Sequence, residues 1–420
     1  MKFPTEKHLQ NFENDAFGYR ELTRKILDDI IIEMEPPNCF GLYGNWGSGK
    51  STMINYMIKH IEDTPAKYNF LTTVYFEPWK YEYSDRKDLL FALLACIKEK
   101  CNIDPERWKK LMTDALVITS GLLRFTKVAD VKKVKDDFKL FEDKIFEEHE
   151  IWIDKVRGVQ KTFKDIVVKV LEETRSEKLI VFIDDLDRCL PENAVKLLEG
   201  IKNFLYVDNT LFVLAIDRRV MSEMIEKKYG LHYGYGGEYL TKIVHYYYEL
   251  PKNDLSQIVK EILGSHGINF NEKQEKYINE FLKKFVSEPR IAKHLLHQFG
   301  MKIALSEKAQ ELIVDDSDTI QLQYFFVATY LLVHFPHLFT AEDSRERLKN
   351  IQESAKQAKK PDRSRNYDDI CSCDKSITPN ERTRLEAVIY CPIKTDKEAS
   401  SLPILDTERL NVALGIIRRI

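Results

Sequence analysis

The chain has 420 residues, a formal net charge of -3 and a hydrophobic content of 44%. These values are typical of a globular protein with two or three domains, and they exclude a disordered chain or a globally basic one that nucleic acid would attract. Seven scattered cysteines do not form the pattern of a disulfide framework, which favours a reducing cytoplasmic location. Residues 1–15 lack the apolar segment of a signal peptide, so we expect no export.

The first predicted element is a buried strand over 39–43, followed by a glycine-rich loop and a helix. The loop matches the pattern G-x-x-x-x-G-K-[ST] at Gly44, Gly49, Lys50 and Ser51. In such a loop the backbone N–H groups and the helix N-terminus bind phosphate, the lysine bridges phosphate oxygens, and the hydroxyl binds Mg²⁺. The alternative is a glycine turn without a ligand. The predicted nucleotide-binding residues are Gly44, Asn45, Trp46, Gly47, Ser48, Gly49, Lys50, Ser51 and Thr52.

A second strand is predicted over 71–76, and the next strand begins only near residue 179. The interval of about 84–178 is longer than one crossover connection requires. Four apolar residues within it recur at helical spacing, so we predict a large helical insertion. They are Val134, Phe138, Phe141 and Ile145. The insertion either packs on the core and does nothing more, or has a role of its own.

The third strand, over 179–184, is apolar and ends in a cluster of acidic residues. A carboxylate at the end of a buried strand beside the phosphate loop suits the ligand shell of Mg²⁺, and this position belongs to Asp184. Asp185 is then placed to orient and polarise the attacking water. The alternative is that these acids cap the helix that begins near Pro191, and Asp187 is assigned to such a structural role.

A fourth strand over 210–216 ends at Asp217, where a polar side chain can face the γ-phosphate. Arg218 and Arg219 follow. One of them either reaches the nucleotide of a neighbouring subunit as an arginine finger, or both are solvated. A fifth strand follows at 245–250. Five apolar strands that alternate with helices predict a parallel sheet covered by helices on both faces.

Residues 254–340 read as amphipathic helices, which we assign to a smaller domain after the core of residues 1–253. The apolar run 324–335 is too short to span a bilayer and predicts a buried helix, so no membrane contact is expected. Within this domain, Arg290 is either a residue that reaches the phosphates as the domain closes, or a partner in a surface ion pair.

Residues 341–420 are predicted to be a linker and a small tail of unknown role, with a charged, proline-interrupted segment at 354–369. Its basic side chains either contact nucleic acid or a partner, or remain solvated. They are Lys356, Lys359, Lys360, Arg363 and Arg365. Three cysteines of the tail, Cys371, Cys373 and Cys391, lack the paired spacing of a zinc site.

Six segments in this order resemble the KAP family of P-loop NTPases over roughly residues 12–305. They read GLYGNWGSGKST, VYFEPWKYE, VFIDDLDRC, LFVLAIDRR, YLTKIVHYYYELP and EPRIAKHLLHQF. The most specific features are Trp46 in the loop, Trp79 after the second strand and the Asp-Asp-Leu-Asp-Arg run at 184–188. Members often have Asn-Ala-Trp where this chain has Glu77-Pro78-Trp79, so any role of that asparagine is absent here or belongs to Glu77.

The resemblance implies an additional-strand (ASCE-type) P-loop NTPase fold, in which the strand ending at Asp184 lies next but one to the phosphate-loop strand. It also implies a C-terminal helical lid and Mg²⁺-dependent ATP hydrolysis. Position by position it assigns phosphate binding to Lys50, metal binding to Ser51 and Asp184, water activation to Asp185, and the lid arginine to Arg290. Many members carry transmembrane helices in this domain, whereas this sequence is similar to the soluble bacterial type, whose genes often lie beside partner genes in phage-defence or mobile-element clusters.

We therefore expect an ATPase whose binding and hydrolysis cycle drives a conformational switch, in a homo-oligomer or in a complex with products of neighbouring genes. The absence of a guanine-reading N-K-x-D pattern favours ATP over GTP. Two other functions remain open: a kinase that transfers the γ-phosphoryl group to a small acceptor, and a scaffold that binds ATP without hydrolysing it.

Overall fold

The structure is a computed structural model that describes most of residues 18–82, 89–109, 157–251, 255–309, 319–339, 345–351 and 407–418. The chain divides into two compact units at Pro251. The first unit contains the sheet and the phosphate loop, and the second contains the helices that follow Pro251.

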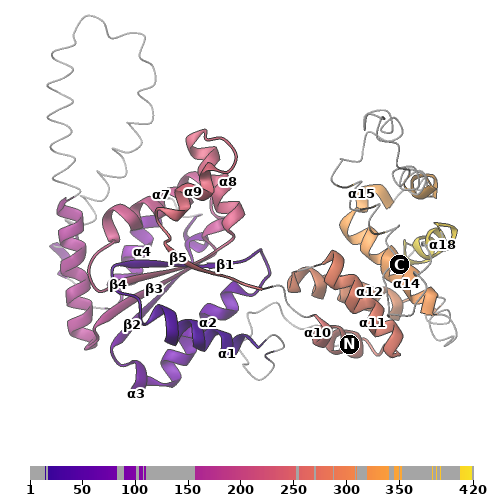
Figure 1. Cartoon of the computed structure of the whole chain (residues 1–420), viewed down its shortest axis with the longest axis horizontal. Coiled ribbons are helices and arrows are strands. Elements are labelled where there is room, and N and C mark those ends of the chain that lie inside the picture. Colours follow the sequence, from indigo (N-terminus) through magenta and orange to yellow (C-terminus); the bar gives the residue numbers. More distant parts are fainter. Residues whose placement is uncertain are drawn as a thin grey trace, which may run out of the picture. The chain divides into compact units, whose positions relative to one another are not determined.

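The first unit is built on a parallel five-stranded sheet with the strand order β2-β3-β4-β1-β5 (Figure 1). The strands are β1 (Asn38–Tyr43), β2 (Leu71–Phe76), β3 (Lys178–Asp184), β4 (Thr210–Ile216) and β5 (Tyr246–Glu249). Because β4 pairs with both β1 and β3, it separates the phosphate-loop strand from the strand that ends at Asp184. This order confirms the additional-strand P-loop fold, and all five strands lie where the sequence predicts them.

Helices cover both faces of the sheet, so alternate side chains of the central strands enter two different cores (Figure 1). In β3, Val181 lies in the core with α4 (Leu89–Lys98) and α7 (Pro191–Gly200). Its neighbour Phe182 lies in the core with α1 (Tyr19–Ile26) and α2 (Lys50–Asp63). Strands buried on both faces need an unbroken apolar sequence, and β4 is buried at every position. The polar residues that follow β3 and β4 are thereby delivered to one edge of the sheet.

The helices of the first unit connect these strands. One face carries α1 (Tyr19–Ile26), the π-helical turn η1 (Leu27–Ile31), α2 (Lys50–Asp63) and α3 (Pro65–Tyr68). The other carries α4 (Leu89–Lys98), a helix over residues 157–174, α7 (Pro191–Gly200), η4 (Ile201–Leu205), α8 (Arg218–Tyr229) and α9 (Tyr235–Thr241). Two 3₁₀ turns, η2 (Pro78–Tyr81) and η3 (Leu186–Arg188), follow β2 and β3.

The described ends of the predicted insertion are helical, at α4 and at residues 157–174. Both pack into the core that contains Val181. Several predictions fall on residues outside the described ranges: the apolar residues between Val134 and Ile145, the charged segment 354–369 and the three cysteines of the tail. The assignments of residues 84–178 and 341–420 as an insertion and a tail therefore stay predictions.

The second unit contains α10 (Ser256–Ser265), α11 (Glu272–Phe285), α12 (Pro289–Ala304), α14 (Thr319–His334), α15 (Pro336–Phe339) and α18 (Thr407–Arg418). Phe281 of α11 and Phe299 of α12 both stack edge to face on Phe326 of α14. The run 324–335 is helical to residue 334, and Phe326 and Tyr330 are fully buried, which confirms a buried helix. Among the described helices, none is long and apolar enough to cross a membrane.

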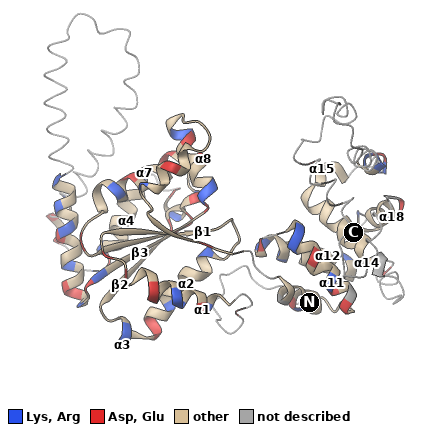
Figure 2. Ribbon diagram, viewed as in Figure 1, with Lys and Arg blue, Asp and Glu red and all other residues tan. Residues whose placement is uncertain are grey.

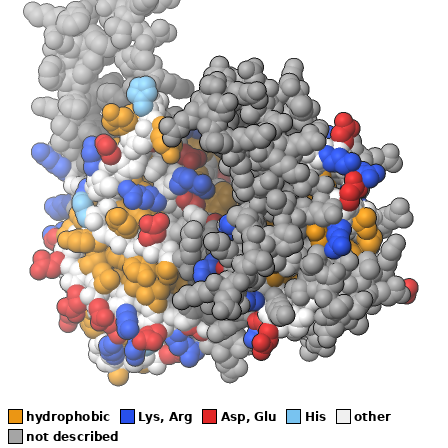
Figure 3. Space-filling view, turned by 45° about the vertical axis from the view of Figure 1, so that its right-hand side comes forward, with side chains coloured by type: hydrophobic (Ala, Val, Ile, Leu, Met, Phe, Trp, Pro, Cys, Tyr) orange, Lys and Arg blue, Asp and Glu red, His pale blue; other side chains and the backbone are white. Residues whose placement is uncertain are grey.

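Charged side chains lie mainly on the covering helices and loops, whereas the central strands are almost free of charge (Figure 2). On the face drawn in Figure 3, a patch of hydrophobic side chains is bordered by both acidic and basic ones. The described residues of this face thus carry a mixed-sign surface, which agrees with the small net charge.

Candidate functional site

The phosphate loop connects β1 to α2. It requires glycine for two reasons, a left-handed backbone conformation and a close approach by a neighbouring side chain. Gly47 and Gly49 have φ angles of 82° and 104°, in the left-handed region that favours glycine. Gly44 has no such angle, but a Cβ there would lie 2.5 Å from the Oγ atom of Ser48. The hydroxyl of Tyr19 in α1 donates a hydrogen bond to the carbonyl oxygen of Ser48 and holds the loop from outside.

Lys50 begins α2, and its side chain folds back under the loop. Its ammonium group donates to the carbonyl oxygens of Gly44, at 2.8 Å, and Asn45, at 3.1 Å. Burial lowers the pKa of Lys50, and the negative charges of Asp187 and Asp184 oppose this shift. The ammonium therefore lies inside the loop that is predicted to hold phosphate.

Ser51, in the first turn of α2, and Asp184, the last residue of β3, lie at the same edge of the sheet. Oδ2 of Asp184 accepts from the hydroxyl of Tyr75 in β2 at 3.3 Å, and the Ser51 side chain lies close enough to lower the pKa of this carboxyl by hydrogen bonding. Asp184 is 1% exposed, and burial together with the charge of Asp185 raises its pKa to about 6. A hydroxyl and a buried carboxylate in contact are oxygen ligands of the kind that Mg²⁺ prefers.

Asp185 has a left-handed backbone, with φ 58° and ψ 24°, which is uncommon for a residue with a side chain. Its amide donates to Oδ1 of Asp184 at 2.9 Å. Its own carboxylate forms an ion pair with Arg188, at 2.9 Å from Oδ1 to Nη2. The guanidinium of Arg188 in turn lies over the Trp79 ring, 5.7 Å from its centroid.

Asp187 and Asp217 complete the polar edge of the sheet. Oδ2 of Asp187 accepts hydrogen bonds from Nε1 of Trp46, at 3.0 Å, and from the backbone amide of Asp217, at 2.7 Å. The carboxylate of Asp217 caps α8 by accepting from the amides of Arg219 and Val220. The acids after β3 do not cap α7, whose N-cap position is Leu190 without a side-chain bond.

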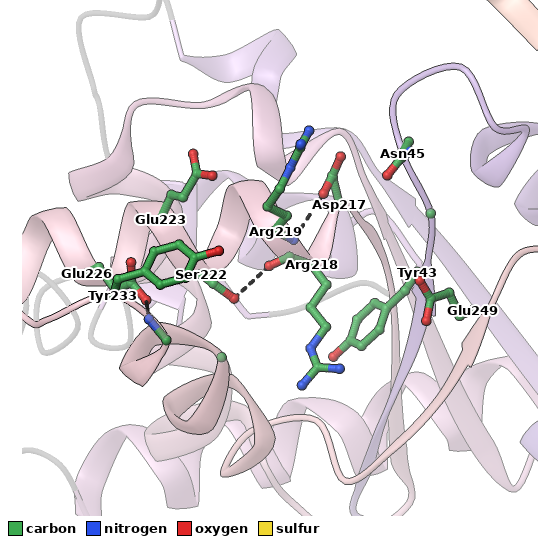
Figure 4. A pocket seen from close by; sticks show the side chains of 13 residues that line it. Tyr43, Asn45, Asp217, Arg218, Arg219, Ser222, Glu223, Glu226, Tyr233 and Glu249 are labelled. Atoms are coloured by element: carbon green, nitrogen blue, oxygen red, sulfur yellow. Dashed lines mark hydrogen bonds between the residues drawn. The ribbon is translucent and has the colours of Figure 1, made fainter. Parts of the chain in front are cut away.

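A pocket of about 300 Å³ adjoins the phosphate loop on the side of α8 and α9. Gly44 and Asn45 line it together with Arg218, Tyr43 and Glu249. The guanidinium of Arg218 lies beside the Tyr43 ring and 5.5 Å from the centroid of the Tyr247 ring, whereas Arg219 extends in the opposite direction (Figure 4). Both predicted finger candidates line this pocket, and Arg218 is the one whose side chain packs on an aromatic ring.

The structure brings most of the predicted site residues together, and one belongs to the other unit. The loop residues, Asp184, Asp185 and Asp217 all lie at the carboxyl edge of the sheet. Glu77 follows β2 and pairs with Lys80. Arg290 is the second residue of α12 in the second unit and its side chain is exposed, so its role stays a prediction.

Sequence reasoning did not find the partners of these residues. Tyr75 is an ordinary strand residue in the sequence, and its contact with Asp184 depends on the pairing of β2 with β3. Asp187 was assigned a structural role near the next helix, whereas its bonds reach the loop and the end of β4. Arg188 lies three residues after Asp185, so the sequence was compatible with an ion pair between them. This spacing alone does not predict such a pair.

Comparisons with known proteins agree with this geometry. The model of the KAP family P-loop domain matches residues 20–305, which is more than half of the chain. The phage T7 exclusion protein of Escherichia coli is 21% identical over 270 residues, which are 60% of this chain but 35% of that protein. The kinase D-interacting substrate of 220 kDa from rat and human is 44% identical over 61 residues, 14% of this chain and 3% of each relative.

Solved structures with low similarity cover nearly the whole chain. The ORC2 protein of Aeropyrum pernix is 14% identical with a TM-score of 0.34, covering 96% of this chain and 93% of that one. The ORC1 protein of the same organism is 12% identical with a TM-score of 0.35, covering 94% and 91%. Such scores are too low to support an argument, so the strand order, the phosphate-loop geometry and the family match carry the conclusion. The chain belongs to the KAP family of P-loop proteins.

Proposed function

We propose that this protein binds Mg·ATP at the loop of residues 44–52 and hydrolyses it. The observation that best supports this function is the contact between Ser51 and the buried carboxylate of Asp184, beside the ammonium of Lys50. The lysine and the hydroxyl at the N-terminus of α2, together with the carboxylate at the end of β3, are suited to bind a phosphate chain and a metal ion.

The loop fits a phosphate group on the evidence of its backbone. Its glycines adopt conformations and close approaches that a side chain would prevent, and α2 begins at its end with the N-terminal dipole directed toward the loop. Lys50 would exchange its two carbonyl partners for phosphate oxygens, which are stronger acceptors because they are charged. Mg²⁺, held by Ser51 and Asp184, would neutralise phosphate charge.

Asp185 is the residue that we propose to orient and polarise the attacking water. It directly follows the metal carboxylate, and its ion pair with Arg188 restrains its side chain. Asp217 has its carboxylate committed to the cap of α8, and Glu77 follows β2 and not the metal carboxylate, so each is a weaker candidate for this role.

We further propose that turnover drives a conformational switch, with the helices of residues 254–340 as a lid that carries Arg290. The similarity to a phage T7 exclusion protein supports a role in defence against phage, in a homo-oligomer or with products of neighbouring genes. Because this chain matches 35% of that protein, the similarity does not extend to the whole relative.

A turnover assay tests the proposed function. Purified protein is incubated with Mg·ATP, with and without nucleic acid, and inorganic phosphate and labelled acceptors are both measured. Release of phosphate that Asp185→Asn abolishes supports hydrolysis by this site. Transfer to an acceptor would establish a kinase, and binding without either product would establish an ATP-bound scaffold.

A further inference from the structure

One oxygen atom of Asp187 connects three segments of the candidate site. Oδ2 accepts from the Trp46 indole in the phosphate loop and from the Asp217 amide at the end of β4, and it lies 3.9 Å from the ammonium of Lys50. The side chain of Asp187 is 1% exposed. Trp46 and Lys50 belong to the phosphate loop and Asp217 follows β4, and none of them is a neighbour of Asp187 in sequence.

A buried carboxylate of this kind is stable only if charged or hydrogen-bonding groups compensate for its lost hydration. The two N–H donors and the Lys50 ammonium supply that compensation, and Asp187 is the charge that most strongly opposes the lowering of the Lys50 pKa. The arrangement is reciprocal, because the carboxylate also fixes its donors. The Trp46 side chain is held in place although it is 51% exposed.

We propose that Asp187 is a positioning residue of the nucleotide site, which fixes the phosphate loop against the end of β4 through Trp46. This inference rests on the proposed function. It differs from the roles of Asp184 and Asp185, because Asp187 acts through the loop and not on the metal or the water. A loop held in its binding conformation before nucleotide arrives loses less conformational entropy on binding, so its affinity is higher.

A double-mutant cycle on Trp46 and Asp187 tests this tether, with the dissociation constant of Mg·ATP measured by calorimetry. We expect Trp46→Phe to raise the constant about threefold and Asp187→Ala about tenfold, with no further increase in the double variant. Asp187→Asn keeps an oxygen that accepts both N–H groups and should remain within about threefold of the wild type. This rescue separates the hydrogen bonds from the charge.

Asp28→Ala is the matched control for a general loss of stability. Asp28 also accepts two side-chain hydrogen bonds, but its partners are Lys67 and Tyr68 of α3. We expect this variant to lower the unfolding temperature without changing the affinity for Mg·ATP. A second readout is the fluorescence emission of Trp46, obtained in each background as the difference between the protein with Trp46 and the same protein with Trp46→Phe. The emission maximum should shift in Asp187→Ala and stay at the wild-type position in Asp187→Asn.

Two different results would overturn two different claims. If the wild type binds Mg·ATP and the effects of Trp46→Phe and Asp187→Ala simply add, Asp187 does not act through the loop and the tether is wrong. If the wild type does not bind Mg·ATP at all, the proposed function itself is wrong.

Discussion

The carboxylate of Asp185 is 2.9 Å from the guanidinium of Arg188, within the single turn that follows β3. The Asp185 side chain is 12% exposed and that of Arg188 is 30% exposed, so water screens the pair only in part. Arg188 is also packed over Trp79, which follows β2. The residue proposed to activate water is thus held by a partner that the neighbouring strand end supports.

The first prediction separates hydrolysis from binding at Asp185. Asp185→Asn keeps the size of the side chain but removes the charge that polarises water, so turnover should fall roughly 10²–10⁴-fold. Affinity for Mg·ATP should stay within several-fold, since the charge acts on the transition state. Asp184→Asn, measured in the same titration of Mg²⁺ and ATP, should also weaken the dependence on Mg²⁺. Normal turnover in the Asp185 variant would transfer the role to Glu77 or Asp217.

Arg188 should contribute to turnover through its effect on the orientation of Asp185. We expect Arg188→Ala to reduce turnover about tenfold, because a misplaced base transfers protons poorly, and to leave the affinity for Mg·ATP almost unchanged. Phosphate release and calorimetry measure the two quantities. An increase in turnover would show that the ion pair restrains Asp185 instead of orienting it.

Arg290 tests the contribution of the second unit. If its guanidinium reaches the phosphates during turnover, Arg290→Ala should lower phosphate release about tenfold or more, since arginines that stabilise transferring phosphoryl groups have at least such effects. The nearby Lys293 is also exposed on α12, and Lys293→Ala provides the matched control. Equal activity in the two variants would place Arg290 outside the site.

We expect a pair of histidines to make the stability of the second unit dependent on pH. Nε2 of His266 is 3.0 Å from Nδ1 of His297, and this hydrogen bond needs one ring nitrogen without a proton. Burial lowers the pKa of both side chains below the usual value near 6.5. The unfolded chain therefore binds more protons as the pH falls through that value, and stability present above it is lost below it.

Lowering the pH from 8 to 5 should thus reduce the unfolding temperature of the second unit by about 2–4 °C through this pair alone. Calorimetric scans of the whole chain measure the shift. In His297→Gln, which has a polar side chain that does not titrate, the dependence on pH should shrink. If the unfolding temperature of this variant depends on pH as strongly as that of the wild type, groups other than the histidine pair cause the dependence.

The positions of the central strands were predictable because strands buried on both faces have an apolar composition, whereas β5 is largely exposed and was predicted from its β-rich aromatic residues. The run at 71–76 coincides with β2, and Asp184 ends β3 as expected. The strand order was available only through the resemblance to a family, since five apolar runs of similar length contain no information on which pairs form. The sheet edge that collects Asp184 and Asp217 follows from that order.

The side-chain partners were not predictable, because they depend on distances of a few ångströms between segments far apart in sequence. Trp46 and Asp187 are separated by 141 positions, and neither the spacing nor the residue types predict that they bond. The sequence favoured Trp46 as a residue close to the nucleotide, whereas its indole is bonded to Asp187 and half its surface is exposed. Its distance to a bound nucleotide stays a prediction.

Calorimetric titration of the wild type and Lys50→Ala with Mg·ATP tests the central claim most directly. The loop holds the Lys50 ammonium beside Gly44 and Asn45, where its removal leaves the β- and γ-phosphates without their positive partner. We predict saturable binding by the wild type, and binding that is abolished or severely weakened in a variant that remains folded. Equal affinity in the two proteins would contradict the assignment of residues 44–52 as the phosphate site.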